Sequence, residues 1–184
     1  MRIVRPIFLV PLANDRHGKS TIIKALVAQG IGRAFQVQRK GQRGLVSPTG
    51  RNVDAYVFGR SYQEKEKGEH GSVAAALDAN DPLWRTRELI VMPSHVSGVK
   101  AKGLPDDLDQ MIDAAHSAGF DIVCAAVLFD SGHEQLPPTL PGIWRKTWDA
   151  RWRLPNPFIP SPDGQLNALG CDLWGWTCRA LTGG

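Results

Sequence analysis

The stretch "RPIFLVPLANDRHGKSTIIKALVAQG", residues 5–30, decides how this chain folds. The apolar run over residues 3–10 predicts a short buried strand, and a polar loop follows it. From Lys19 to Gln29 the apolar residues recur at helical spacing, and Gly30 is expected to stop the helix. The stretch therefore predicts a strand, a loop and a helix in close succession.

The loop between this strand and this helix fits a phosphate-binding pattern in its permissive form, with alanine at the first position. A glycine at the start of the helix lets the backbone approach an anion closely, and the helix N-terminus carries partial positive charge. Lys19 would neutralise the β- and γ-phosphates, and Ser20 would offer its hydroxyl to Mg²⁺. The residues expected to contact a nucleotide are Ala13, Asn14, Asp15, Arg16, His17, Gly18, Lys19, Ser20 and Thr21.

The rest of the chain continues with alternating strands and helices. Further strands are expected at 34–38, in two runs within 44–59 around a Pro-Thr-Gly turn, at 88–95 and at 120–130, with helices near 72–79 and at 106–118. This order predicts an α/β fold, a three-layer sandwich with a mostly parallel central sheet. Strands 3–10, 88–92 and 121–128 are apolar with little alternation, so we expect them side by side in its centre.

The loop and its flanking elements resemble the P-loop NTPase superfamily, most closely the ParA/MinD-type partition and positioning ATPases. The loop lies close to the N-terminus, and "RELIVMPSHVSG" (87–98) falls where that branch has the strand leading into its phosphate-sensing switch. "NPFIPSPDGQLNALG" (156–170) is similar to the proline-bearing segment that borders adenine there, which implies a nucleotide contact at Pro160. The length predicts one domain over 1–184, with 1–136 as the nucleotide-binding core; residues 137–184 could be a peripheral subdomain, but their aromatic content predicts that they pack on this core.

The resemblance also implies ATP and Mg²⁺ as cofactors, and slow hydrolysis that acts as a switch, in plasmid or DNA partition or stability. A homodimer and DNA or a DNA-bound protein are the implied partners. Two departures keep alternatives open: Asn14 stands where that branch carries a signature lysine, and no acidic residue follows Ile90 and Val91 in the switch strand. A small-molecule or nucleotide kinase and a non-hydrolysing nucleotide-binding regulator are the alternatives. No Asn-Lys-x-Asp motif is present, so guanine is not the expected base.

Mg²⁺ at a nucleotide needs oxygen ligands, commonly a hydroxyl and a carboxylate. Asp130 follows an apolar run and is the expected partner of Ser20, although it could equally be a turn residue before Ser131 and Gly132. Asp54 and Asp15 are further options for the carboxylate.

Several other polar residues are candidates for the chemistry. Ser94 and His95 could sense or polarise a γ-phosphate. Arg51 and Arg60 flank a run that would cover the phosphates, and an arginine can stabilise charge on a transferring phosphoryl group. We take Lys19, Arg60 and Asp130 as the catalytic candidates. The charged segment 60–71 is expected to be a solvated loop or helix face.

The C-terminal third contains five of the six tryptophans. Trp144, Trp148 and Trp152 stand at i, i+4 and i+8, which predicts one face of a helix with basic residues around it. Three readings remain for this stripe: packing on the sheet, self-association, or binding of nucleic acid through stacking and phosphate neutralisation.

Composition sets the remaining expectations. The net charge of +4 favours anionic ligands without itself indicating nucleic acid. No apolar run approaches the roughly 20 residues of a membrane span, so a cytoplasmic protein without membrane contact is expected. The three cysteines form no CxxC pair, which favours reduced thiols over a disulfide or metal framework.

Overall fold

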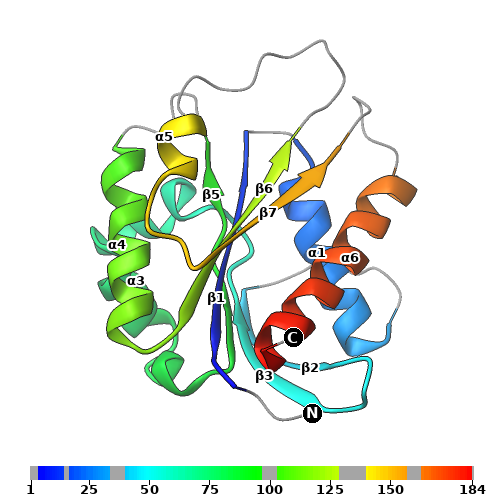
Figure 1. Cartoon of the computed structure of the whole chain (residues 1–184). Helices are drawn as coiled ribbons and strands as arrows, with labels where there is room; N and C mark the ends of the chain where they lie inside the picture. Colours follow the sequence, from blue (N-terminus) through cyan, green and yellow to red (C-terminus); the bar gives the residue numbers. More distant parts are fainter. Residues whose placement is uncertain are drawn as a thin grey trace.

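The computed structural model describes residues 4–14, 17–33, 40–96, 103–128, 140–156 and 163–183 (Figure 1). The elements follow in chain order: β1 (Ile7–Ala13), α1 (Lys19–Ile31), β2 (Gly41–Val46), β3 (Asn52–Val57), the 3₁₀ helix η1 (Tyr62–Glu64), α2 (Glu66–His70), α3 (Val73–Asn80), the 3₁₀ helix η2 (Trp84–Thr86), β4 (Leu89–Val91), β5 (Ser94–His95), α4 (Leu104–Ser117), β6 (Asp121–Leu128), α5 (Leu140–Trp144), β7 (Ala150–Pro155) and α6 (Asp163–Thr182).

The described strands form one seven-stranded sheet in the order β2-β3-β4-β1-β6-β7, with β5 beside the end of β1. Every pair is parallel except the β2–β3 hairpin. Phe8 on β1 is in register with Ile90 on β4 and with Ile122 on β6. This confirms the prediction that these three strands lie side by side in the centre of the sheet.

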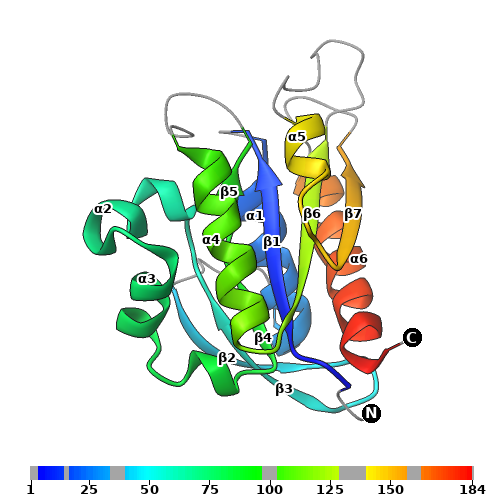
Figure 2. The ribbon, with the colours of Figure 1, turned by 60° about the vertical axis from the view of Figure 1, so that its left-hand side comes forward.

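Helices cover both faces of the sheet, which gives an α/β architecture compatible with a three-layer sandwich. In Figures 1 and 2, α1 and α6 lie on one face, and α3, α4 and α5 lie on the other. Among the described residues, no helix combines the length and the apolar character that a bilayer crossing requires.

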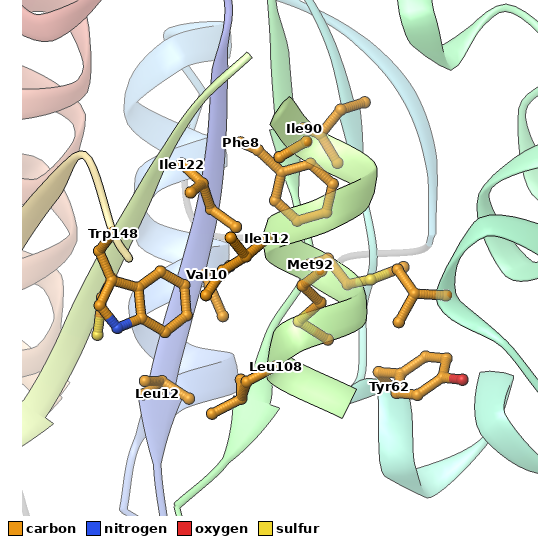
Figure 3. Packing of buried hydrophobic residues seen from close by; sticks show 14 of the residues in the cluster. Phe8, Val10, Leu12, Tyr62, Ile90, Met92, Leu108, Ile112, Ile122 and Trp148 are labelled. Atoms are coloured by element: carbon orange, nitrogen blue, oxygen red, sulfur yellow. The ribbon is translucent and has the colours of Figure 1, made fainter. Parts of the chain in front are cut away.

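The buried side chains of β1 divide between the two faces, as the alternation of a strand requires. Phe8, Val10 and Leu12 belong to the cluster under α4, where they pack with Ile112 and Met92 (Figure 3). The residues that alternate with them belong to the cluster under α1 and α6; these are Ile7, Leu9 and Ala13. Both faces of β1 are therefore buried, which explains why its sequence is apolar without alternation.

Helices α1 and α6 approach each other closely at Gly170. A Cβ atom on Gly170 would lie 2.4 Å from the Cβ of Ala25 and 2.7 Å from the carbonyl oxygen of Ile22. Only glycine fits such a contact, because Cβ atoms do not approach to such distances. The expected stop of α1 at Gly30 is wrong, since the helix continues to Ile31 and ends at Gly32, whose φ is 64°.

The tryptophan-rich segment does not form the predicted helix. Trp144 ends α5, Trp148 lies in the following turn, and Trp152 belongs to strand β7. The guanidinium of Arg151 donates to the carbonyl oxygens of Trp144, Lys146 and Trp148, which fixes the turn. These bonds replace the helical ladder that the tryptophan spacing suggested. The strand expected at 34–38 lies outside the described residues.

Candidate functional site

The junction of β1 and α1 lies at the carboxyl edge of the parallel strands. After β1 the chain turns toward β2, β3 and β4, whereas after the adjacent strand β6 it continues to β7 on the other side. In open α/β sheets, ligands bind in the crevice where two neighbouring strands part in this way. The predicted phosphate loop therefore occupies the place where the topology favours a binding site (Figure 1).

Gly18 is fixed at the start of α1 for two physical reasons. Its φ of 79° is in the left-handed region that favours glycine. A Cβ atom there would also lie 2.6 Å from Cδ2 of Leu166 on α6. The carbonyl oxygen of Gly18 accepts from the backbone N–H of Ile22 at 2.9 Å, so the glycine begins the helical ladder.

The first turn of α1 has a chemistry that suits an anion. Among the described residues no side chain caps it, and no acidic residue stands in it. The positive end of the helix dipole is therefore not neutralised within the described chain, and its first backbone N–H groups can receive an acceptor. Ser20 is exposed and Thr21 is partly buried in this same turn.

Lys19 is buried and its ammonium group lies over the end of β1. Its Nζ donates to the carbonyl oxygen of Ala13 at 3.2 Å. The backbone N–H of His17 donates to the carbonyl oxygen of Asn14 at 3.4 Å, and both residues are partly buried. Asp15 and Arg16 lie outside the described residues.

Strand β5 brings Ser94 and His95 beside this junction. In the parallel register, Leu12 pairs with Ser94 and Ala13 pairs with His95. His95 is 1% exposed, and its Nε2 lies 3.1 Å from a carboxylate oxygen of Glu64. The structure thus joins the predicted phosphate-sensing histidine to the end of β1.

A polar network extends from β5 to helix α4. The side-chain amide of Gln63 donates to Oγ of Ser94 at 2.8 Å and to Asp107 at 3.2 Å. Asp107 is 1% exposed and accepts from Nζ of Lys67 at 2.6 Å. The network therefore connects the neighbourhood of the phosphate loop with the first turn of α4.

Sequence reasoning missed four residues of this neighbourhood: Gln63, Glu64, Lys67 and Asp107. Residues 60–71 were expected to be solvated throughout, yet Tyr62 and Glu66 are buried. Tyr62 and Glu66 stand among charged residues without the spacing of a helix or strand face. No local pattern therefore indicates which side chains of this segment are buried. Asp107 reads from the sequence as an ordinary acidic residue in the first turn of a helix.

Of the predicted site residues Arg51, Arg60 and Asp54, only Arg60 lies at the carboxyl edge of the sheet. Arg51 forms an ion pair with Glu88. Asp54 accepts from Arg87 at 2.7 Å, and these groups lie at the opposite, amino-terminal side of β3 and β4. Asp54 is therefore not brought to the predicted phosphate loop.

Arg60 follows the carboxyl end of β3 and is exposed. It borders a pocket of about 380 Å³ together with Lys40, Lys65 and Glu66. Neighbouring strands lie about 4.8 Å apart, so β3, two strands from β1, is about 10 Å from it. The structure thus brings Arg60 to the correct edge without bringing it to the junction itself.

Asp130 and Pro160 lie outside the described residues. Strand β6, which leads to Asp130, runs parallel to β1 and ends at Leu128 at the same edge. Ser20 is the only one of the two predicted metal ligands in the described part of the chain.

A scan against protein-family models found no matching family, and searches of curated proteins and of solved structures found no significant match.

Proposed function

We propose that the protein binds a nucleoside triphosphate, ATP, at the N-terminus of α1 and hydrolyses it slowly with Mg²⁺. The observation that carries the proposal is the first turn of α1, which follows a central parallel strand and in which the described residues include neither a capping side chain nor an acid. Gly18 and Lys19 stand at this turn. Phosphate oxygens are the acceptors that such a turn favours.

Each residue of the loop has a defined task in this proposal. The backbone N–H groups from Gly18 onward hold the phosphates, and Lys19 exchanges the carbonyl oxygen of Ala13 for a phosphate oxygen. Ser20 and Asp130 hold the metal ion. Mg²⁺ supplies neutralisation of charge on the attacking and leaving oxygens. Pro160 borders the adenine.

Hydrolysis serves as a switch in this proposal. His95 and Glu64, beside Ala13, report whether a terminal phosphate is present. The hydrogen bonds of Gln63 with Ser94 and Asp107 provide a route by which a shift of β5 reaches α4. By the resemblance to ParA/MinD-type ATPases, the switch acts in plasmid or DNA partition in the cytoplasm, as a homodimer that meets DNA or a DNA-bound protein.

A kinase is the second candidate, and the pocket at Arg60 favours it. Of its three cations, Lys40 pairs with Glu66 at 2.9 Å and Lys65 with Glu69 at 3.6 Å, whereas Arg60 forms no ion pair within the described residues. An anionic acceptor held there would lie about 10 Å from β1, at the same edge of the sheet. The third candidate is a regulator that binds ATP without turnover.

Calorimetry with ATP and Mg²⁺ tests the binding site. Lys19→Ala should weaken binding by about 1.5–3 kcal/mol, the range for a charge-assisted hydrogen bond. Lys24→Ala is the matched control, because it removes the same charge from the same helix beyond its first turn; we expect its affinity to equal that of wild type. Equal affinities for Lys19→Ala and wild type would refute the phosphate loop.

Labelled ATP then distinguishes the three candidates. Release of inorganic phosphate that Asp130→Asn abolishes, with metal-free binding retained, would support the ATPase with Asp130 at the metal. Transfer of the label to a small acceptor, lost in Arg60→Ala, would support the kinase. Binding with no turnover above buffer would leave the regulator.

A further inference from the structure

A second candidate site lies along the free edge of the sheet, apart from the phosphate loop. Strand β7 is the last in the sheet and pairs only with β6 among the described strands. A pocket of about 540 Å³ opens against β7 and α6. It is lined by Ala150, Arg151, Trp152, Arg153, Trp176 and Arg179, together with Ala180.

Two tryptophans form the apolar part of this pocket. The ring centroids of Trp152 and Trp176 lie 6.0 Å apart, with an angle of 71° between the ring planes. Both rings are partly buried against the core under α1 and α6, and both also line the pocket. An edge-to-face pair does not cover the two ring faces as a stacked pair would. The pocket therefore offers indole surface to a planar ligand.

Arginines form the polar part. The guanidinium of Arg151 is engaged with three backbone carbonyl oxygens. Arg153 and Arg179 are exposed, and within the described residues neither forms an ion pair. Its described lining residues include no carboxylate. Two cations thus stand beside the indole pair without a described counter-charge.

We propose that this pocket binds single-stranded nucleic acid. Unpaired bases have planar faces that stack on indole rings, and the phosphates between them need the cations that Arg153 and Arg179 supply. A duplex keeps its base faces inside its own stack, so it can use the arginines but not the tryptophans. The inference does not rest on the proposed nucleotide site, since no residue is shared between the two.

The charge of the strand disfavours a second copy of this chain at the same edge. Pairing β7 with another β7 would bring the arginines of the two strands together, and like charges across such a pair are destabilising. An acidic peptide would satisfy the arginines and leave the indole faces without a planar partner. Single-stranded nucleic acid is the occupant that uses both halves of the pocket.

Fluorescence anisotropy of the full chain with a labelled oligothymidylate of about 20 nucleotides tests the proposal, because such sites cover roughly 4–16 nucleotides. Arg153→Gln and Arg179→Gln should each weaken binding severalfold and lower the slope of log Kd against log salt by about 0.7. Trp152→Leu, which keeps an apolar cover on the core, should weaken binding about tenfold. Arg85→Gln is the control, because it removes one exposed charge from the other face of the sheet.

Three results would overturn the proposal. The first is wild-type affinity in both arginine variants. The second is a duplex of equal length that binds as tightly as the single strand. The third is a dimer in sedimentation that Trp152→Leu dissociates, which would assign the face to a second copy. Binding of oligouridylate as well as oligothymidylate supports the proposal and shows that the site accepts RNA and DNA. Lys19→Ala should bind the oligonucleotide like wild type.

Discussion

The two helical layers of this molecule are built from different interactions. On one face α1 and α6 meet through apolar side chains and the backbone of Gly170, close enough that a single methyl group does not fit. On the other face, buried polar groups accompany the core: Ser94 and Asp107 are each at most 1% exposed. The first layer resists displacement, because its contacts are made by packed apolar atoms.

This difference suggests that the two layers have different roles around the candidate site, one holding α1 in place and the other able to change its contacts. Helix α1 must hold its N-terminus still if it is to present N–H groups to phosphate, and α6 supports it from Leu166 to Gly170. Polar networks can exchange partners when a ligand arrives, so the layer of α3 and α4 is suited to respond. Substitutions in each layer test whether the two layers differ in this way, and the largest expected change in stability comes first.

Breaking the buried ion pair of the polar layer should cost most. Arg87 donates to Asp81 at 2.8 Å, and both side chains are 7% exposed. The hydrogen bonds from Arg87 to Asp81 raise the pKa of the guanidinium further, so the arginine stays charged. Arg87→Ala should lower the free energy of unfolding by about 3–5 kcal/mol in denaturant titration, because it leaves a buried carboxylate unpaired.

Arg85→Ala is the matched control for that measurement. Its ion pair with Asp78 is about half exposed on each side, so the loss should stay below about 1 kcal/mol. Similar losses for Arg85→Ala and Arg87→Ala would contradict the view that burial distinguishes the two pairs.

Adding one methyl group to the apolar layer should have the next largest effect. Gly170→Ala should destabilise the protein by about 1–3 kcal/mol, because α1 and α6 must separate to admit the Cβ atom. Gly175→Ala, on the same helix with nothing within 4 Å of a Cβ, should instead stabilise it by about 0.5–1 kcal/mol. Thermal unfolding of both variants measures the two signs. Stabilisation by both would mean that the helices adjust freely.

At neutral pH the buried thiols, one in each core cluster, should have the smallest effect, and that effect grows only above about pH 9. Burial raises the pKa of Cys124, under α4, from 9.0 to about 12, and that of Cys178, under α6, to about 11. The unfolded thiol loses its proton near pH 9 while the folded thiol keeps it. The folded state then binds more protons, and stability falls as pH rises from about 9 toward 12.

Denaturant titration between about pH 8 and about pH 10.5 should therefore show a decline in stability, by at most about 1.4 kcal/mol per pH unit for each thiol. Cys124→Ala and Cys178→Ala should each flatten the decline by a similar amount, because both folded thiols have pKa values above this window; each variant is compared with its own stability at neutral pH. An identical decline in wild type and both variants would mean that other groups cause the loss of stability. Tyr62 is the first such group to test, because burial raises its pKa to about 12.

Features formed by residues that are neighbours in sequence were predictable, and features formed by contacts between distant segments were not. Strand β1, the turn at Gly18 and the amphipathic start of α1 depend on neighbouring residues, so periodicity and glycine placement indicate them. The central position of β4, β1 and β6 followed from their apolar character. The polar network depends on contacts between segments more than 30 residues apart, such as Gln63 with Asp107, and no local pattern encodes these.

The C-terminal region shows how a period can mislead. Tryptophans at i, i+4 and i+8 suggested a helix, yet Ala150, Trp152 and Leu154 alternate with arginines at the period of two that marks a strand. That alternation was the signal that could have identified β7. Helix α6 carries three internal glycines, which lower helix propensity, so packing against α1 rather than local preference accounts for it.

The contact between Gly18 and Leu166 also bears on how the protein is made. The glycine at the start of α1 is contacted by a residue of α6 far later in the chain, and β1 pairs with β4 and β6 only after more than 80 and 110 further residues, respectively. Such distant pairings slow folding and leave apolar strands exposed meanwhile. A nascent chain in which α6 has not yet formed therefore lacks the contact of Leu166 at the start of α1 and exposes apolar strands that chaperones can bind.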